Sequence, residues 1–317
     1  MGLSTNAIEV SNLQKAYKDL QVLDGVSFEV EQGTVFALLG TNGSGKTTTI
    51  NILTTLIEAD AGTASVGGFD VSTQSAGVRE QISVTGQYAA VDYVLTAREN
   101  LELMGELRHV SNPGATAAEL LEKFDLNEAA DRRLLTFSGG MRRRLDIAMS
   151  LVGDAPIIFF DEPTTGLDPR GRADMWETIQ KLAGSGTTVF LTTQYLEEAD
   201  RLADRIAILR GGRIVAEGKP EELKSMVPAG IVEIELAEPT QVAAVLKALG
   251  GQYETETVDS KLVVATTGSV AELADLFLRL KDTGIEPTRL TKQNPTLDDV
   301  FFKILGEERE DSYASSN

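Results

Sequence analysis

Hydrophobic and polar residues alternate in two stretches near the start of the chain. Residues 7–10 and 26–30 carry apolar side chains at every second position, which is typical of a β-strand with one buried face. Residues 35–39 are instead apolar without interruption, as in a strand buried on both faces, and they run into a glycine-rich turn. Helix-forming residues follow from Lys46 to about Ile57. The pattern predicts a β-rich start and then a strand–turn–helix unit.

A helical pattern replaces the strands from about residue 91 to residue 154. Apolar residues recur there at helical spacing, and Asn112-Pro113-Gly114 interrupts them. Beyond this stretch, strands are predicted over residues 157–160 and 187–191, and helices over residues 172–182 and 195–203. Such alternation indicates a largely parallel sheet flanked by helices, with the helical stretch as a subdomain.

The last hundred residues show a second pattern, which begins after Gly218-Lys219-Pro220. Its order is β-α-β-β-α-β, followed by one more helix, which indicates a small ferredoxin-like α+β domain. The expected elements are strands at 231–236, 252–258, 262–265 and 285–290, and helices at 241–249, 270–280 and 297–305. We therefore expect a first domain over residues 1–226, a second over 229–306, and an acidic, disordered tail over 307–317.

Composition narrows the class of protein. Of 317 residues, 42% are hydrophobic and 24% are charged, as in an ordinary globular protein. The formal net charge of −19 argues against nucleic-acid binding, because a phosphate backbone would be repelled. Cysteine is absent, which excludes disulfides and thiol chemistry. We find neither a secretory signal nor an apolar run near the roughly 18 residues that cross a bilayer, so at a membrane another chain would have to span it.

The turn after the first buried strand matches a phosphate-binding loop. Its sequence fits G-x-x-x-x-G-K-[ST] and lies between a strand and a helix, the context that this motif requires. Backbone N–H groups of such a loop face phosphates, the lysine reaches the β- and γ-phosphates, and the Thr47 hydroxyl can ligate Mg²⁺. A glycine-rich structural turn is the alternative. The candidate ATP-binding residues of the loop are Gly40, Thr41, Asn42, Gly43, Ser44, Gly45, Lys46, Thr47 and Thr48.

Two carboxylates end the apolar strand predicted over residues 157–160. Asp161 can hold the coordination shell of Mg²⁺, and Glu162 can polarise the attacking water, so both halves of nucleotide hydrolysis are present. The alternative is a carboxylate that caps a helix before Pro163. With Lys46 in the same chain, we prefer the catalytic interpretation, in which Lys46 and Glu162 are catalytic and Asp161 and Thr47 are metal ligands.

The segment Phe137-Ser138-Gly139-Gly140-Met141 resembles the signature of ABC ATPases. The resemblance implies that two such subunits pack head to tail on ATP, with Ser138, Gly139 and Gly140 of one copy closing over the phosphate held by Lys46 of the other. Met141 stands where the family commonly has glutamine. Three further positions match in order, and the resemblance implies that they contact nucleotide, Mg²⁺ or the partner copy: Tyr17 as the adenine-stacking aromatic, Gln87 as a Mg²⁺-sensing residue and Asp168 as a dimer-contacting residue.

One departure from the family concerns turnover. Gln194 stands where most relatives have histidine, and an amide cannot carry a titrating proton, although it can still donate a hydrogen bond toward the γ-phosphate or the water. We therefore expect hydrolysis that is slow but retained. His109, the one histidine of the chain, lies in the helical stretch and is expected at the surface.

Nearly the whole chain resembles the daunorubicin-resistance branch of bacterial and archaeal drug-efflux ATPases. Gln194, the run from Gly139 to Ile147, residues 161–170 and the C-terminal Pro295-Thr296-Leu297-Asp298-Asp299 carry the resemblance. It implies a peripheral subunit at the cytoplasmic face of the membrane that powers a separate permease and carries amphipathic drugs. The arginines at 142–144 fan around a helix, and we assign them mainly to structure or to dimer contacts.

Other functions compete with drug export. A glutamine-bearing relative could be a regulator that binds nucleotide and hardly hydrolyses it, or the exported substrate could be a lipid or a polysaccharide. A ribosome- or DNA-acting relative is disfavoured by the single cassette and the acidic surface. The C-terminal domain is expected to regulate or stabilise the dimer.

Overall fold

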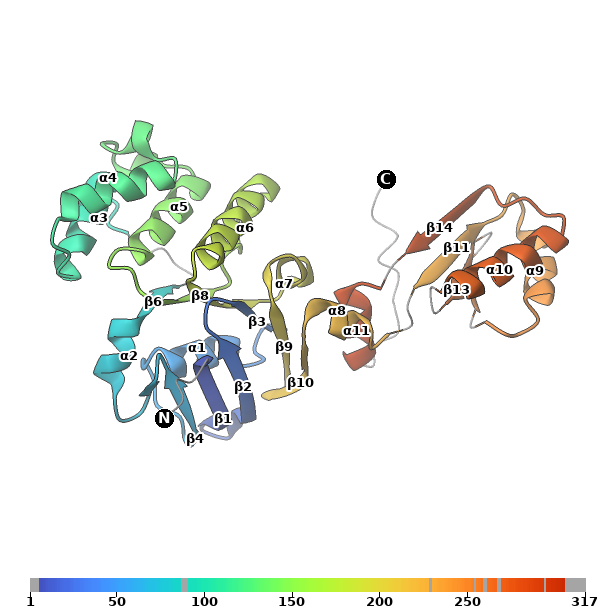
Figure 1. Ribbon diagram of the computed structural model, residues 1–317, viewed down its shortest axis with the longest axis horizontal. Helices are drawn as coiled ribbons and strands as arrows, with labels where there is room; N and C mark the ends of the chain where they lie inside the picture. The colour runs from blue at the N-terminus through green and yellow to red at the C-terminus, as the bar shows by residue number, and fades with distance from the viewer. Residues whose placement is uncertain are drawn as a thin grey trace. The chain divides into compact units, whose positions relative to one another are not determined.

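A computed structural model describes residues 6–86, 91–227, 230–253, 255–258, 261–266, 269–293 and 295–305 (Figure 1). The chain forms two compact units, Met1–Lys219 and Pro220–Asn317. The division precedes the boundary at Met226 expected from the sequence, because helix α8 (Pro220–Lys224) packs with the last helix, α11 (Leu297–Leu305), in the second unit. Gln87 and the tail over 307–317 lie outside the described residues.

A six-stranded sheet forms the centre of the first unit, in the order β10-β9-β3-β8-β7-β6. All neighbours are parallel except the edge strand β10, which pairs antiparallel with β9. Every residue of β3, β7 and β8 is buried, as the sequence predicted for strands in the interior of a parallel sheet. The strands are β3 (Val35–Leu39), β6 (Ile82–Thr85), β7 (Ile157–Asp161), β8 (Thr188–Thr193), β9 (Arg205–Arg210) and β10 (Arg213–Gly218).

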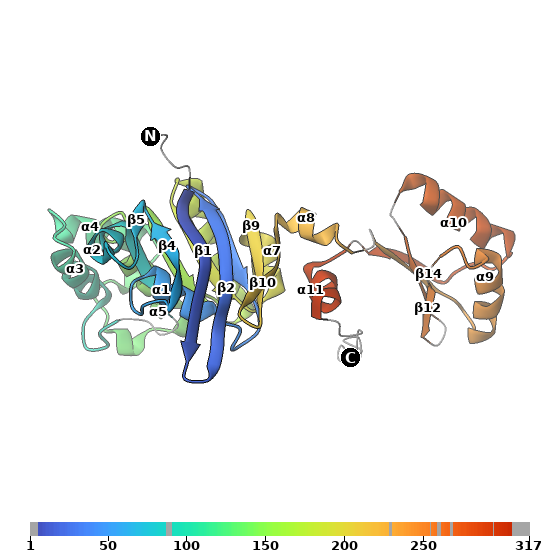
Figure 2. The same cartoon turned by 90° about the horizontal axis from the view of Figure 1, so that it is seen from below.

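A second, antiparallel sheet packs against the first. Its order is β2-β1-β4-β5, and its two long strands form the hairpin that Figure 2 shows most clearly. The strands are β1 (Asn6–Tyr17), β2 (Leu20–Glu31), β4 (Ala61–Val66) and β5 (Phe69–Asp70). Phe28 of β2 stacks on Phe36 of β3 with ring centroids 5.0 Å apart, and Phe36 stacks on Phe190 of β8 at 5.5 Å. This apolar core also includes buried residues of α1 (Lys46–Leu53) and so packs both sheets against the helix that follows the phosphate-binding loop.

Helices α3 (Ala97–Leu107), α4 (Pro113–Lys123) and α5 (Gly139–Ser150) gather to one side of these sheets (Figure 1). Thr96 begins α3 with a capping box that it shares with Glu99, and Asn112 caps α4. His109 follows α3 and is exposed. The remaining helices of the first unit are α2 (Ser75–Gln81), α6 (Pro169–Gly184) and α7 (Leu196–Leu202), and two short 3-10 turns are η1 (Asn127–Ala129) and η2 (Leu134–Thr136).

The second unit confirms the predicted ferredoxin-like order. Its antiparallel sheet runs β12-β13-β11-β14, and α9 and α10 cover one face (Figures 1 and 2). The last strand begins at Arg289 rather than at residue 285, because Pro287 lacks the N–H that a strand pairing uses. The elements are β11 (Ile231–Glu235), η3 (Pro239–Gln241), α9 (Val242–Leu249), β12 (Thr255–Val258), β13 (Lys261–Ala265), α10 (Val270–Asp282) and β14 (Arg289–Gln293). Among the described residues, no helix is both long and apolar enough to cross a bilayer.

Candidate nucleotide-binding site

The loop between β3 and α1 has a backbone that glycine makes possible. Gly45 has φ of +111°, and a Cβ there would lie 2.6 Å from Leu23 Cδ2 and 3.0 Å from the Val22 carbonyl oxygen. A Cβ on Gly40 would lie 2.5 Å from the Leu209 carbonyl oxygen. The loop therefore lies tightly against its neighbours and presents the N-terminus of α1, an arrangement that favours anions.

Lys46 lies inside the loop. Its side chain is 4% exposed, and its Nζ donates to the carbonyl oxygens of Gly40 at 2.9 Å and of Thr41 at 3.1 Å. The same Nζ lies 3.3 Å from Glu162 Oε1. The buried Ser44 hydroxyl has no hydrogen-bond partner among the described residues, so it can bind a ligand in the loop. A phosphate fits this set of one ammonium, one hydroxyl and the N–H groups of a helix N-terminus.

Asp161 joins three elements at the carboxyl end of the sheet. Thr47 Oγ1 donates to it from α1, at 3.1 Å from Oδ2 and 3.4 Å from Oδ1. Thr192 Oγ1 donates to Oδ1 from β8 at 2.6 Å. The sequence pattern alone does not predict Thr192 as a residue of the site. In the sequence, Thr192 is only a polar residue near the end of a buried strand. The parallel pairing of Asp161 with Thr192 is what brings its hydroxyl to the carboxylate.

Glu162 turns the chain sharply after β7. Its φ is +50°, which is uncommon for a residue with a side chain and costs about 1–3 kcal/mol. The Glu162 N–H donates to the Thr192 carbonyl oxygen at 3.1 Å and to its Oγ1 at 3.2 Å, and Thr165 Oγ1 donates to Glu162 Oε2 at 3.2 Å. The carboxylate is thereby directed at Lys46, where a nucleotide's terminal phosphate would lie.

The remaining predicted residues lie at different distances from this centre. Gln194 directly follows β8 and is half-buried, and the Gly40 N–H donates to the carbonyl oxygen of the preceding Thr193 at 3.1 Å. Tyr17 ends β1 and is 48% exposed, and Lys15 Nζ lies over its ring, 5.7 Å from the centroid. The segment of Gln194 is thus tied to the loop, and Tyr17 offers an accessible aromatic surface.

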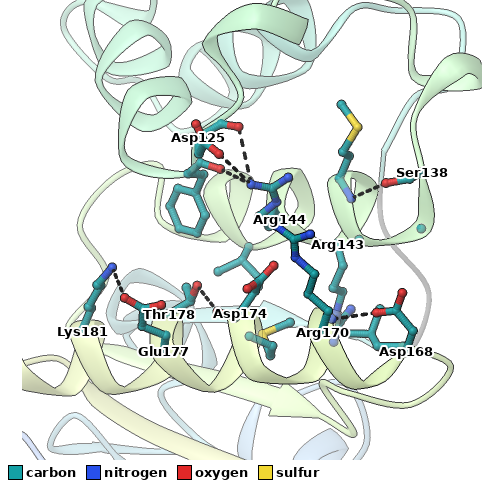
Figure 3. A pocket seen from close by; sticks show the side chains of 18 of the residues that line it. Asp125, Ser138, Arg143, Arg144, Asp168, Arg170, Asp174, Glu177, Thr178 and Lys181 are labelled. Carbon is teal, nitrogen blue, oxygen red and sulfur yellow. Dashed lines mark hydrogen bonds and ion pairs between the residues drawn. The ribbon is translucent and has the colours of Figure 1, made fainter.

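The signature residues lie elsewhere, on a cavity of about 660 Å³ between α5 and α6 (Figure 3). Ser138 caps α5 by accepting from the Met141 N–H at 3.2 Å, and Asp168 caps α6 by accepting from the Gly171 N–H at 2.7 Å. Gly139 and Gly140 also line this cavity, whereas none of the loop residues 40–48 does. Within one chain, the structure therefore brings Lys46, Thr47, Asp161 and Glu162 together and keeps the signature apart from them.

Two family models match the chain. One, described as ABC transporter, covers residues 23–165, and the other, described as the C-terminal domain of DrrA1-3-like ATP-binding protein, covers residues 218–305. The first spans the phosphate-binding loop, the signature and both carboxylates, and the second spans all of the described second unit.

Relatives extend over almost the full length. The chain is 44% identical to the daunorubicin resistance ATP-binding protein DrrA2 of Streptomyces coeruleorubidus, over 97% of this chain and 98% of that protein. It is 43% identical to the daunorubicin/doxorubicin resistance ATP-binding protein DrrA of Streptomyces peucetius, over 97% and 94%. It is 37% identical to the Nod factor export ATP-binding protein I of Burkholderia orbicola, over 98% and 100%.

Solved structures match the first unit. The ATP-binding subunit of an ABC transporter aligns with a TM-score of 0.62 and 29% identity, over 69% of this chain and 92% of that one. A dimeric ATP-binding cassette in a post-hydrolysis state, bound to ADP and phosphate, aligns with a TM-score of 0.61 and 26% identity, over 67% and 98%. The chain therefore belongs to the ATP-binding subunits of ABC transporters, as an export ATPase of the branch that includes the daunorubicin and doxorubicin resistance proteins.

Proposed function

We propose that this ATPase powers the export of an amphipathic drug through a separate membrane permease. The observation that carries the proposal is the meeting of Lys46, Asp161 and Glu162 at one end of the sheet, in a chain whose relatives are named for drug resistance. The chain would act at the cytoplasmic face of the membrane as a peripheral subunit.

The phosphate-binding loop binds the nucleotide, and Glu162 activates the attacking water. The N-terminus of α1 and the Lys46 ammonium bind the β- and γ-phosphates of ATP, and the Ser44 hydroxyl supplies a further donor. Glu162, held by Thr165 and directed at Lys46, accepts a hydrogen bond from the attacking water and polarises it. Fixed groups of this kind need little rearrangement when charge develops during the reaction.

Magnesium fits the oxygen atoms of Thr47 and Asp161. A hydroxyl and a carboxylate are hard ligands, and Mg²⁺ is usually held by one or two such protein groups together with phosphates and waters. When bound, the ion supplies positive charge that offsets the charge of the phosphates. The assignment of Gln87 to this ion, which falls outside the described residues, stays a prediction from the family resemblance.

Two copies of the chain complete the site. Ser138, Gly139, Gly140 and Asp168 line a cavity separate from the loop around Lys46. A head-to-tail homodimer that forms on ATP binding would bring the signature of one copy to the γ-phosphate of the other, with Tyr17 stacking on adenine. The dimeric cassette among the similar structures supports this arrangement.

Gln194 determines the rate of ATP hydrolysis that we expect. It follows the strand that carries Thr192, and its amide can donate a hydrogen bond toward the γ-phosphate or the water without exchanging a proton. Hydrolysis is therefore retained but slow, which separates this proposal from a regulator that binds nucleotide without turnover.

The second unit is proposed to regulate or stabilise the dimer, because it follows a complete cassette. Deleting residues 227–317 should leave ATP binding intact and weaken assembly or transport. Unchanged transport by the truncated chain would count against this role.

The test of drug export is ATP-dependent uptake of daunorubicin into inverted membrane vesicles of a host that contains the chain and its permease. Uptake is expected with the wild-type chain and is expected to vanish with Glu162→Gln. Equal uptake by both would remove daunorubicin as the substrate. One relative is named for Nod factor export and not for drug resistance, so the alternative of a lipid or polysaccharide substrate stays a second candidate, which the same vesicles can test by competition.

A further inference from the structure

Three consecutive arginines, residues 142–144, follow the signature turn in α5, and their side chains diverge as helical geometry requires. Arg142 donates from Nε and Nη2 to the Phe137 carbonyl oxygen, at 3.1 and 2.9 Å. Arg144 donates from Nη1 to the Phe124 carbonyl oxygen at 3.2 Å, on the side that Figure 3 shows. Both arginines therefore bind backbone of the same helical region that contains α5.

Arg143 contacts a different part of the unit. Its Nε donates to the Pro163 carbonyl oxygen at 3.1 Å, one residue after Glu162. Its Nη1 donates to the Gly86 carbonyl oxygen at 2.9 Å, directly after β6, and to Asp146 Oδ2 at 2.9 Å. One side chain on the signature helix thus holds the backbone that follows each of two strands of the central sheet.

The Arg143 guanidinium is buried among carboxylates. Its side chain is 11% exposed, and burial lowers its pKa against the opposing effect of Asp146, Glu198 and Asp161. Its Nη2 has no acceptor among the described residues. Burying a charge costs free energy that a well-packed apolar side chain such as methionine would avoid. Packing alone therefore does not account for an arginine at this position.

The Pro163 carbonyl matters because of the residue before it. A φ of +50° at Glu162 persists only where the surrounding structure restrains the chain. The Thr192 carbonyl restrains the Glu162 N–H, and Arg143 restrains the chain on the other side, through the Pro163 carbonyl.

We propose that Arg143 is a positioning residue for hydrolysis: it ties the signature helix to the backbone around Glu162, so that the orientation of α5 sets where the Glu162 carboxylate lies. The proposal rests on the role of Glu162 given above and adds a connection inside one chain between the signature and the hydrolytic carboxylate. In this role Arg143 acts through the Glu162 backbone rather than on the nucleotide.

The neighbouring arginine provides a matched control. Arg143→Met removes the donors to Pro163 and Gly86, whereas Arg144→Met removes a donor to the Phe124 carbonyl oxygen and leaves Arg143 in place. A displacement of about 1 Å at a reacting group can cost on the order of 100-fold in rate. We expect kcat for ATP to fall at least about tenfold in Arg143→Met, with KM and the Kd for ADP near the wild-type values, and kcat to stay within about twofold in Arg144→Met.

The assay uses the full-length chain in membranes that contain its permease, with the amount of chain and its Tm measured for each variant. If Arg143→Met does not fold, Arg143→Lys and Arg144→Lys replace the pair, because a lysine keeps the charge but lacks the separate Nε and Nη1 donors with which Arg143 reaches Pro163 and Gly86. An intermediate kcat for Arg143→Lys, with Arg144→Lys unchanged, supports the proposal. Equal kcat losses in the two members of a pair, a change in KM alone, or wild-type kcat in the Arg143 variant would overturn it.

The same assay separates this inference from the proposed function. If the Glu162→Gln variant hydrolyses ATP at the wild-type rate, Glu162 has no catalytic role, and there is no reason to position it. If the Glu162→Gln variant loses ATP hydrolysis but the Arg143→Met variant keeps the wild-type rate, the proposed function stands and only the positioning role of Arg143 is removed.

Discussion

Thr192→Val removes the shortest hydrogen bond to Asp161 without changing the strand. The Thr192 side chain is fully buried, and its Oγ1 lies 2.6 Å from Asp161 Oδ1. Valine has nearly the same shape but no hydroxyl. The Glu162 N–H still has its hydrogen bond to the Thr192 carbonyl oxygen, at 3.1 Å, so the substitution leaves this backbone donor with a partner. Asp161 keeps its contact with Thr47.

A hydrogen bond to a charged group contributes about 1.5–3 kcal/mol to stability. The free energy of unfolding of the first unit should therefore fall by about that amount in Thr192→Val. At about 2–4 °C per kcal/mol for a domain of this size, Tm should fall by roughly 3–12 °C. Because Asp161 also becomes less fixed, the Mg²⁺ concentration that gives half-maximal hydrolysis should rise.

Thr188→Val is the matched control, since Thr188 is buried at the opposite end of the same strand and accepts from the Gly33 N–H at 3.0 Å. That hydrogen bond joins two neutral groups, so about 0.5–1.5 kcal/mol should be lost, with the Mg²⁺ dependence unchanged. Urea unfolding and a Mg²⁺ titration of ATPase activity measure both quantities. Equal stability losses in the two variants together with unaltered Mg²⁺ dependence would refute the reasoning.

Three further predictions concern the phosphate-binding loop, the buried Glu198 and Gln194. Gly45→Ala should weaken ATP binding at least about tenfold, because a side chain at φ of +111° costs about 1–3 kcal/mol and the new Cβ meets Leu23 and the Val22 carbonyl. Gly43→Ala should weaken binding less, because there is open space around Gly43. Equal losses of affinity in the two variants, measured by calorimetry, would argue against a steric cause. Burial raises the pKa of Glu198 above 4.5, an effect that the neighbouring Thr193 and Thr164 hydroxyls, the hydrogen bond from Trp176 and the charge of Arg143 offset only in part. The native state therefore keeps this proton to higher pH, so the stability contributed by Glu198 is complete below pH 4.5 and is lost as pH rises through the raised native pKa. Glu198→Gln should accordingly gain stability relative to the wild type as pH rises, and a pH-independent difference in urea unfolding would contradict this. Gln194→His should raise kcat several-fold and make it fall below about pH 6.5, near the usual pKa of histidine; a flat profile at the wild-type rate would count against the assigned role of Gln194.

The parts of the site that the sequence predicted are those set by local chemistry. A glycine-rich turn between a buried strand and a helix needs its residues in consecutive order, so Gly40 to Thr47 could be recognised directly. Asp161 and Glu162 could be recognised because they end a buried apolar strand. In the second unit, the alternating patterns are strong enough to predict the order of the elements, but the hydrophobic pattern alone places the start of the last strand too early, because Pro287 keeps the strand from beginning before Arg289.

The parts that could not be predicted depend on packing between distant segments. Thr192 approaches Asp161 only because β8 pairs with β7 in a particular register. The arginines at 142–144 look alike in sequence, and only the packing of α5 shows that the middle one contacts Gly86 and Pro163. The role of a side chain at such positions follows from the face of the helix that is buried, which the hydrophobic pattern of α5 alone leaves undetermined.

The most direct test of the account is steady-state ATP hydrolysis by the wild-type chain and by Glu162→Gln, measured with its permease and alongside the binding of ATP. Slow but measurable wild-type hydrolysis is expected, together with a loss of at least about 100-fold in kcat and unchanged ATP binding in the variant. A Glu162→Gln variant that hydrolyses ATP at the wild-type rate would contradict the account.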